Sequence, residues 1–152
     1  MKILKITLLI ILFIIVAIQF IPTNKPKVLL TNENDLIYNN QLPESVANLL
    51  KESCYDCHSN ETIYPWYSYV APVSWLVVRD VKIGRGELNF SHWESQSKID
   101  KAKQLDNIID EVMEENMPMP IYTITHPSAK LNEKNRQLIA DWAERYAESL
   151  FE

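Results

Sequence analysis

The chain has 152 residues, with 20 acidic and 15 basic side chains, and its formal net charge at neutral pH is −5. This length fits one globular domain and leaves no room for a second domain of ordinary size. No basic stripe is present, so the composition argues against nucleic acid as a partner.

The chain opens with an apolar stretch that predicts a membrane anchor. Residues 3–21 are apolar at all but three positions, and as a helix they would span roughly 28 Å, close to the thickness of a bilayer core. A cleaved signal peptide is the alternative, but Ala17-Ile18-Gln19 does not match the small-x-small cleavage pattern. We therefore expect a single-pass transmembrane helix in residues 1–22, with the rest of the chain on the periplasmic, outer side of the cytoplasmic membrane.

Residues 23–41 follow as a predicted linker, because they are rich in Pro, Asn and charge and show little periodicity. The compact domain is expected to comprise residues 42–152. Without Lys2 and Lys5 the chain keeps 13 basic residues against 20 acidic ones, so the domain is distinctly acidic.

The first half of this domain contains two predicted helices. Pro43 can open a helix through "ESVANLLKES", which would lead directly into Cys54. The stretch "APVSWLVVRDVKIGRG" predicts a mostly buried helix that stops at Gly84.

The second half of the domain contains two more predicted helices. The stretch "SKIDKAKQLDNIIDEVMEEN" is amphipathic and must end by Asn116, because prolines follow at positions 118 and 120. Its apolar positions recur at helical spacing: Ile99, Ala102, Leu105, Ile108, Ile109, Val112 and Met113. The last helix begins near Asn132, a good N-cap. The prediction is a small all-α domain of four helices joined by loops.

Between the first two helices lies "CYDCH", which contains the only two cysteines, Cys54 and Cys57, followed by His58. A structural zinc site would need a second pair of ligands, which is missing. A redox dithiol normally follows a strand, and no strand pattern precedes this motif. A structural disulfide would close a very small loop and needs no histidine.

Covalent haem attachment accounts for all three residues. The two thiols form thioethers with the porphyrin vinyl groups, and the following histidine offers a nitrogen to the iron. We therefore predict one haem c per chain, bound through Cys54 and Cys57, with His58 as the proximal iron ligand.

The other face of the iron needs a second ligand, usually methionine or histidine. Met117 and Met119 lie in "NMPMPIY", where the prolines prevent a regular helix. We choose Met117 because it comes first after the helix and Pro118 fixes the chain that leaves it. His126, which precedes a proline in a loop, is the alternative ligand. Met113 is expected in the core, and His92 is expected outside the site.

Several segments together resemble a known family. The stretch from "CYDCHSNETIYPWYSY" to "RGELNFSHWE", followed by "MPMPIY", "HPSAKL" and "LIADWA", resembles the bacterial haem-binding domain family of exported, c-type-cytochrome-like proteins. The resemblance covers roughly residues 40–146. It implies covalent haem at the CxxCH motif with His58 as ligand, and it marks Met117-Pro118 and His126-Pro127 as family features. It supplies neither a substrate nor an electron partner.

The function expected from these features is that of a membrane-tethered monohaem cytochrome that transfers single electrons and is not an enzyme. Its acidic domain favours a redox partner with a basic docking patch. A haem-based sensor, in which Met117 yields to a small ligand, is the first alternative. A thiol-disulfide oxidoreductase that uses Cys54 and Cys57 is the second.

Overall fold

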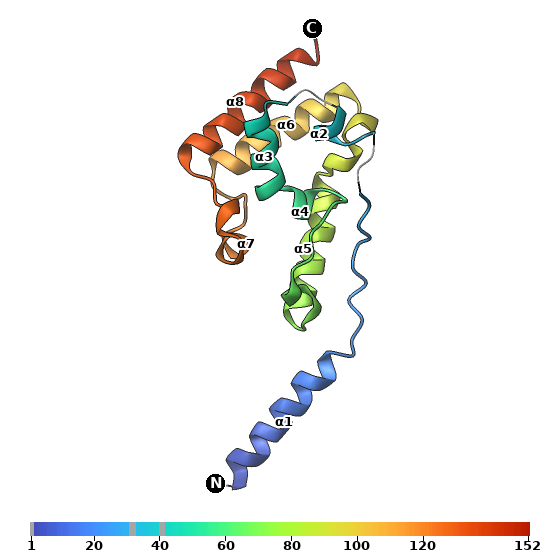
Figure 1. The fold of residues 1–152 in the computed structure, drawn as a ribbon, viewed down its shortest axis with the longest axis vertical. Coiled ribbons are helices and arrows are strands. Elements are labelled where there is room, and N and C mark those ends of the chain that lie inside the picture. Colours follow the sequence, from blue (N-terminus) through green and yellow to red (C-terminus); the bar gives the residue numbers. More distant parts are fainter. Residues whose placement is uncertain (1, 31–32, 40–41) are drawn as a thin grey trace.

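The computed structural model describes residues 2–30, 33–39 and 42–152, and within these ranges all regular structure is helical (Figure 1). The all-α prediction is therefore confirmed for this part of the chain. In chain order the α-helices and 3-10 helices are α1 (Lys2–Ile18), α2 (Leu36–Asn39), α3 (Glu44–Ser53), α4 (Tyr55–His58), η1 (Trp66–Tyr69), α5 (Val73–Glu87), η2 (Phe90–Ser95), α6 (Lys98–Met113), α7 (Pro120–Thr125), η3 (Pro127–Ala129) and α8 (Glu133–Ser149).

The four helices predicted in the domain are present as α3, α5, α6 and α8. Two of them begin at side-chain caps. The Ser97 side chain accepts a hydrogen bond from the Asp100 N–H at the start of α6, and Asn132 accepts one from the Asn135 N–H at the start of α8. Each cap satisfies a backbone donor that the first turn of a helix leaves without a partner.

The N-terminal helix corrects one prediction. Among the described residues, no helix combines the length and the apolar composition needed to cross a membrane. α1 ends at Ile18, and the N–H groups of the next three residues donate to carbonyls three positions earlier, which makes a tight turn in place of further α-helix. The predicted single-pass anchor, and the location at the cytoplasmic membrane that depended on it, are therefore wrong.

Several described residues between α1 and α3 contact the domain. Arg85 donates to the carbonyl of Lys27 at 2.9 Å, and the N–H of Leu29 donates to the carbonyl of Asn60 at 2.8 Å. Leu36, in α2, is fully buried and belongs to the hydrophobic core. Packing of the domain thus begins upstream of Leu42.

α5 differs from its prediction in two ways. It continues beyond Gly84 to Glu87, and it buries one face only, formed by Ser74, Val78, Val81 and Gly84. A Cβ atom at Gly84 would lie 2.7 Å from the carbonyl oxygen of Cys57. The glycine therefore permits a close approach between α5 and the cysteine motif, and it does not end the helix.

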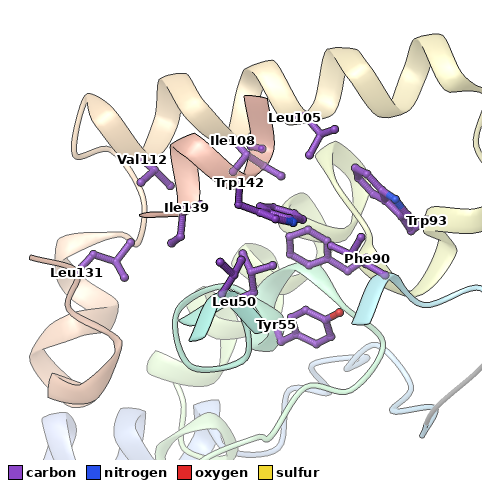
Figure 2. Close-up of a cluster of buried hydrophobic side chains, with 13 residues drawn as sticks. Leu50, Tyr55, Phe90, Trp93, Leu105, Ile108, Val112, Leu131, Ile139 and Trp142 are labelled. Carbon is purple, nitrogen blue, oxygen red and sulfur yellow. The ribbon is translucent and has the colours of Figure 1, made fainter. Parts of the chain in front are cut away.

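The core forms where α6 packs along α8, with α3 and η2 completing it (Figure 2). The ring of Phe90 stacks on Tyr55 with centroids 5.1 Å apart, and the indole N–H of Trp93 donates to the Tyr146 hydroxyl at 3.0 Å. Tyr55 lies between the two cysteines in sequence, so the core directly supports the CxxCH turn.

Two predicted apolar positions of α6 lie outside this core. Ile99 is 73% exposed and Met113 is 46% exposed, although the helical spacing assigned both to the apolar face. They occupy the first and last turns of α6 and, among the described residues, are not part of the hydrophobic cluster. The expectation that Met113 belongs to the core is therefore wrong.

Candidate haem site

The CxxCH motif forms a single helical turn at the junction of α3 and α4. The N–H groups of Cys57 and His58 both donate to the carbonyl of Cys54, at 3.1 and 2.9 Å. Residues three and four apart on a helical turn are neighbours on its surface. The fold therefore places Cys57 and His58 each next to Cys54, beside the core.

The His58 imidazole is oriented by the backbone that follows α5. Its Nδ1 atom lies 3.2 Å from the carbonyl oxygen of Leu88. Burial lowers the pKa of His58, and hydrogen bonds to the backbone of Leu88 and Gly84 oppose this shift. A neutral imidazole whose Nδ1–H donates to a carbonyl keeps a lone pair on Nε2. That is the arrangement found in metal-binding histidines.

Both thiols are free in the structure. Burial, reinforced by the neighbouring Cys57, raises the pKa of Cys54 to about 12. Burial, reinforced by Asp56 and Asp80 and opposed by Arg85, raises the pKa of Cys57 to about 11. Redox-active cysteines have the opposite property, a lowered pKa that makes the thiolate available near neutral pH. The environment of the pair therefore does not favour dithiol chemistry.

Two cavities border the motif. The first, here called the His58 cavity, has a volume of about 430 Å³. Its lining includes Cys54, His58, Phe90, Ile108 and Met117. Such a volume falls within the range of small-molecule and cofactor sites. The groups that line this cavity include the imidazole of His58 and the thioether of Met117.

The second cavity, here called the Cys57 cavity, has a volume of about 350 Å³ and is lined almost entirely by apolar surface. Cys57, Tyr67, Met119, Tyr122 and His126 are among its lining residues. Because Cys54 belongs to one cavity and Cys57 to the other, a group bonded to both sulfurs would contact both cavities.

The candidates for the second iron ligand line different cavities. Met117 lines the same cavity as His58, whereas Met119 and His126 line the Cys57 cavity. The backbone N–H of Met117 donates to the carbonyl of Glu111 at 3.0 Å, which fixes this residue at the end of α6. His92 lines neither of these cavities and lies 3.4 Å from the Asn60 amide nitrogen.

His126 already has several polar neighbours. Its ring stacks on Tyr122 with centroids 4.1 Å apart, and its Nδ1 atom lies 3.1 Å from the Thr125 hydroxyl and 3.2 Å from the Tyr122 carbonyl. The structure thus brings Cys54, His58 and Met117 to one cavity, and Cys57 and His126 to the other.

Sequence reasoning missed three supporting features of the site: the Leu88 carbonyl, Gly84 and the Asp56 carboxylate. Asp56 accepts hydrogen bonds from the Tyr122 hydroxyl at 2.8 Å and from the N–H of Ile63 at 2.8 Å. A polar residue between two motif cysteines was the only available signal for Asp56. The glycine could have been found as a small residue on the buried face of α5.

The donor set and the apolar walls fit a haem. Two free cysteines, one neutral imidazole with an available Nε2 and one thioether are the groups that hold a c-type haem. Within the described residues, the two thiols form no disulfide, and the hydrogen bond of His58 to Leu88 uses Nδ1 and not Nε2.

One of three comparisons with known proteins found a match. No curated protein and no solved structure matches the chain. A family model described as a haem-binding domain matches residues 13–145. This span includes both cavities and nearly the whole chain, so haem is the cofactor and the protein belongs to the haem-binding domain family.

Proposed function

We propose that this protein is a monohaem c-type cytochrome that carries single electrons. The observation that supports the proposal most directly is the His58 cavity, in which the imidazole of His58 and the thioether of Met117 line one space beside Cys54. Histidine with methionine is the ligand pair of electron-carrying cytochromes c. When bound, haem would supply an iron that alternates between the ferrous and ferric states.

Cys54 and Cys57 would hold the cofactor covalently. Each thiol would add across one vinyl group of the porphyrin, with formation of a carbon–sulfur bond and transfer of the thiol hydrogen to the neighbouring vinyl carbon. No oxidant is required for this addition. The attached group would then be held on the same helical turn as its proximal ligand, His58.

The remaining residues would tune the site. The Leu88 carbonyl holds the His58 ring by its Nδ1 atom, which raises the basicity of Nε2 as a ligand. Phe90, Ile108 and Val112 line the His58 cavity with apolar surface, and exclusion of water favours the ferrous state. Both effects are typical means by which a protein sets a haem potential.

The proposal is tested by the behaviour of the matured protein toward carbon monoxide. We expect a reversible one-electron titration and no rapid binding of carbon monoxide to the ferrous form, because Met117 would occupy the sixth position. Rapid binding would contradict the electron-carrier proposal and favour a haem-based sensor.

The Met117 assignment has a matched control in the same segment. Met117→Ala should abolish the sulfur-to-iron charge-transfer band of the ferric protein and lower its reduction potential, since methionine ligation raises the potential. Met119→Ala should leave the band in place, because Met119 lines the other cavity. Loss of the band in Met119→Ala, or its persistence in Met117→Ala, would contradict the assignment.

A further inference from the structure

The segment that contains Met117, Met119 and His126 is weakly packed. Its helix, α7, has no buried residue, and its apolar side chains Ile121 and Ile124 are 64% and 76% exposed. In Figure 1, α7 projects from the end of the α6–α8 pair, apart from the hydrophobic core. Burial of apolar surface therefore does little to fix the position of α7.

A hydrogen bond connects α7 to the attachment motif. The Tyr122 hydroxyl donates to the Asp56 carboxylate at 2.8 Å, and Asp56 lies in sequence between the two cysteines, directly before Cys57. The pair joins positions 66 residues apart. It thus links the segment of the proposed distal ligand to the turn of the proposed proximal ligand.

The acceptor side of this bond is rigid. The second carboxylate oxygen of Asp56 accepts a hydrogen bond from the N–H of Ile63 at 2.8 Å. The backbone carbonyl of Asp56 accepts one from the Thr62 hydroxyl at 2.7 Å. Asp56 therefore cannot turn to follow α7 if α7 moves. Hydrogen bonds to a charged acceptor are also stronger than those between neutral groups.

Tyr122 has a second contact within α7 and its C-cap. Its ring stacks on His126, which keeps the ring oriented toward the Cys57 cavity. The Tyr67 hydroxyl lies 3.1 Å from the Thr125 hydroxyl and supports the same end of α7. Of the contacts made by Tyr122, Tyr67 and His126 described here, only the Tyr122–Asp56 hydrogen bond has a carboxylate as its acceptor.

We propose that Tyr122 is a positioning residue that, through its hydrogen bond to Asp56, keeps the Met117 thioether in the His58 cavity. The inference rests on the proposed function, because it assumes that Met117 is the sixth iron ligand. Met117 is held upstream by its bond to the Glu111 carbonyl and downstream by α7. Loss of the Tyr122–Asp56 bond would free the downstream end and give external ligands access to the iron.

Tyr122→Phe tests the proposal in the full chain with haem attached. The variant removes the hydroxyl and keeps the ring that stacks on His126. Loss of a partly exposed hydrogen bond to a carboxylate shifts a conformational equilibrium by about tenfold. The state in which Met117 has left the iron should be populated more by this factor, so carbon monoxide should bind the ferrous variant about tenfold faster. The reduction potential should fall, and amide hydrogen exchange in residues 117–126 should accelerate.

Two control variants isolate the bond. Tyr64→Phe removes a hydroxyl that donates to the Pro26 carbonyl at 3.1 Å. Tyr64 lines neither cavity, so the variant should leave ligand access and potential unchanged. Asp56→Asn removes the charge and keeps one oxygen for the Ile63 N–H and an NH2 group that can donate to the Tyr122 hydroxyl, so it should have a smaller effect than Tyr122→Phe.

The outcomes separate this inference from the function on which it rests. If the unmodified chain binds carbon monoxide slowly and Tyr122→Phe is identical to it in binding rate, potential and hydrogen exchange, the positioning role is refuted and Met117 ligation stands. If the unmodified chain already binds carbon monoxide rapidly, Met117 is not a stable ligand, and both proposals fail. Should Tyr122→Phe not mature, slow exchange of residues 117–126 in the unmodified chain supports the role, and fast exchange refutes it.

Discussion

The orientation of His58 depends on hydrogen bonds to the backbone of Leu88 and Gly84. The carbonyl of Leu88 meets the imidazole Nδ1 atom at 3.2 Å, and Leu88 follows directly after α5. The position of this carbonyl is therefore set by how closely α5 approaches the motif. Gly84, on the face of α5 that contacts Cys57, permits this approach because it has no side chain.

Gly84→Ala should destabilise the protein and reduce haem attachment. The added Cβ would lie 2.7 Å from the carbonyl oxygen of Cys57, and this atom belongs to the backbone and cannot rotate away. Overpacking of this kind costs about 1–3 kcal/mol, against which the better helix propensity of alanine returns about 1 kcal/mol or less. Thermal unfolding and the yield of haem-loaded chain measure the two effects.

Gly86→Ala is the matched control in the same helix. A Cβ at Gly86 meets nothing within 4 Å, so the substitution should be neutral or stabilise the protein by up to about 1 kcal/mol. Equal losses in the two variants would show that contact with Cys57 does not determine the result.

The buried carboxylate of Asp35 is a second position on which the motif depends. Asp35 is fully buried and accepts hydrogen bonds from Tyr55, Ser91 and the N–H of Ile37. Asp35→Ala should lower the free energy of unfolding by about 2–4 kcal/mol, because three donors lose their partner. Asp35→Asn keeps one acceptor oxygen and should cost less. A denaturant titration in which both variants lose the same stability would contradict this account.

At the scale of elements, the sequence was sufficient to predict the presence of the four domain helices and the motif. The four domain helices follow from periodicity, from the Asn132 cap and from the prolines after Asn116, all of which are local signals. The haem motif is equally local, since its three residues lie within five positions of one another. The family match agrees with the cofactor that this motif predicted.

Features that depend on distant contacts were not predictable. The Leu88 carbonyl lies 30 residues from His58, and Tyr122 lies 66 residues from Asp56. No local pattern reports such pairs. The extent of α1 was also misjudged, because composition does not indicate that the chain turns after Ile18.

Asn132→Ala should weaken α8 and with it the packing against α6. The substitution removes the side-chain acceptor for the Asn135 N–H, and loss of an N-cap typically costs about 1 kcal/mol. Asn132→Asp keeps the acceptor and should be tolerated. Thermal unfolding with no difference between the two variants would argue that the cap contributes nothing to stability.

For the whole molecule, negative charge is the dominant surface property. The formal net charge is −5, and Glu87, Asp110 and Glu111 are among the residues that line the His58 cavity. A protein redox partner of the proposed electron carrier would therefore be expected to present a basic docking patch. Attraction of this kind weakens as salt screens the charges.

Small redox complexes of opposite charge test this electrostatic expectation without knowledge of the natural partner. Electron exchange with a cationic complex should be faster than with an anionic complex of similar potential at low ionic strength. The difference should shrink several-fold as the Debye length falls from about 30 Å to about 8 Å. Faster exchange with the anion at low salt would contradict the expectation.

The most direct test of the central claim is the mass of the denatured chain after maturation with a haem-attachment system. The account predicts the 17.7 kDa chain plus one haem, retained through denaturation because two thioether bonds hold it. A mass equal to that of the bare chain, with the haem lost on denaturation, would contradict covalent attachment at Cys54 and Cys57.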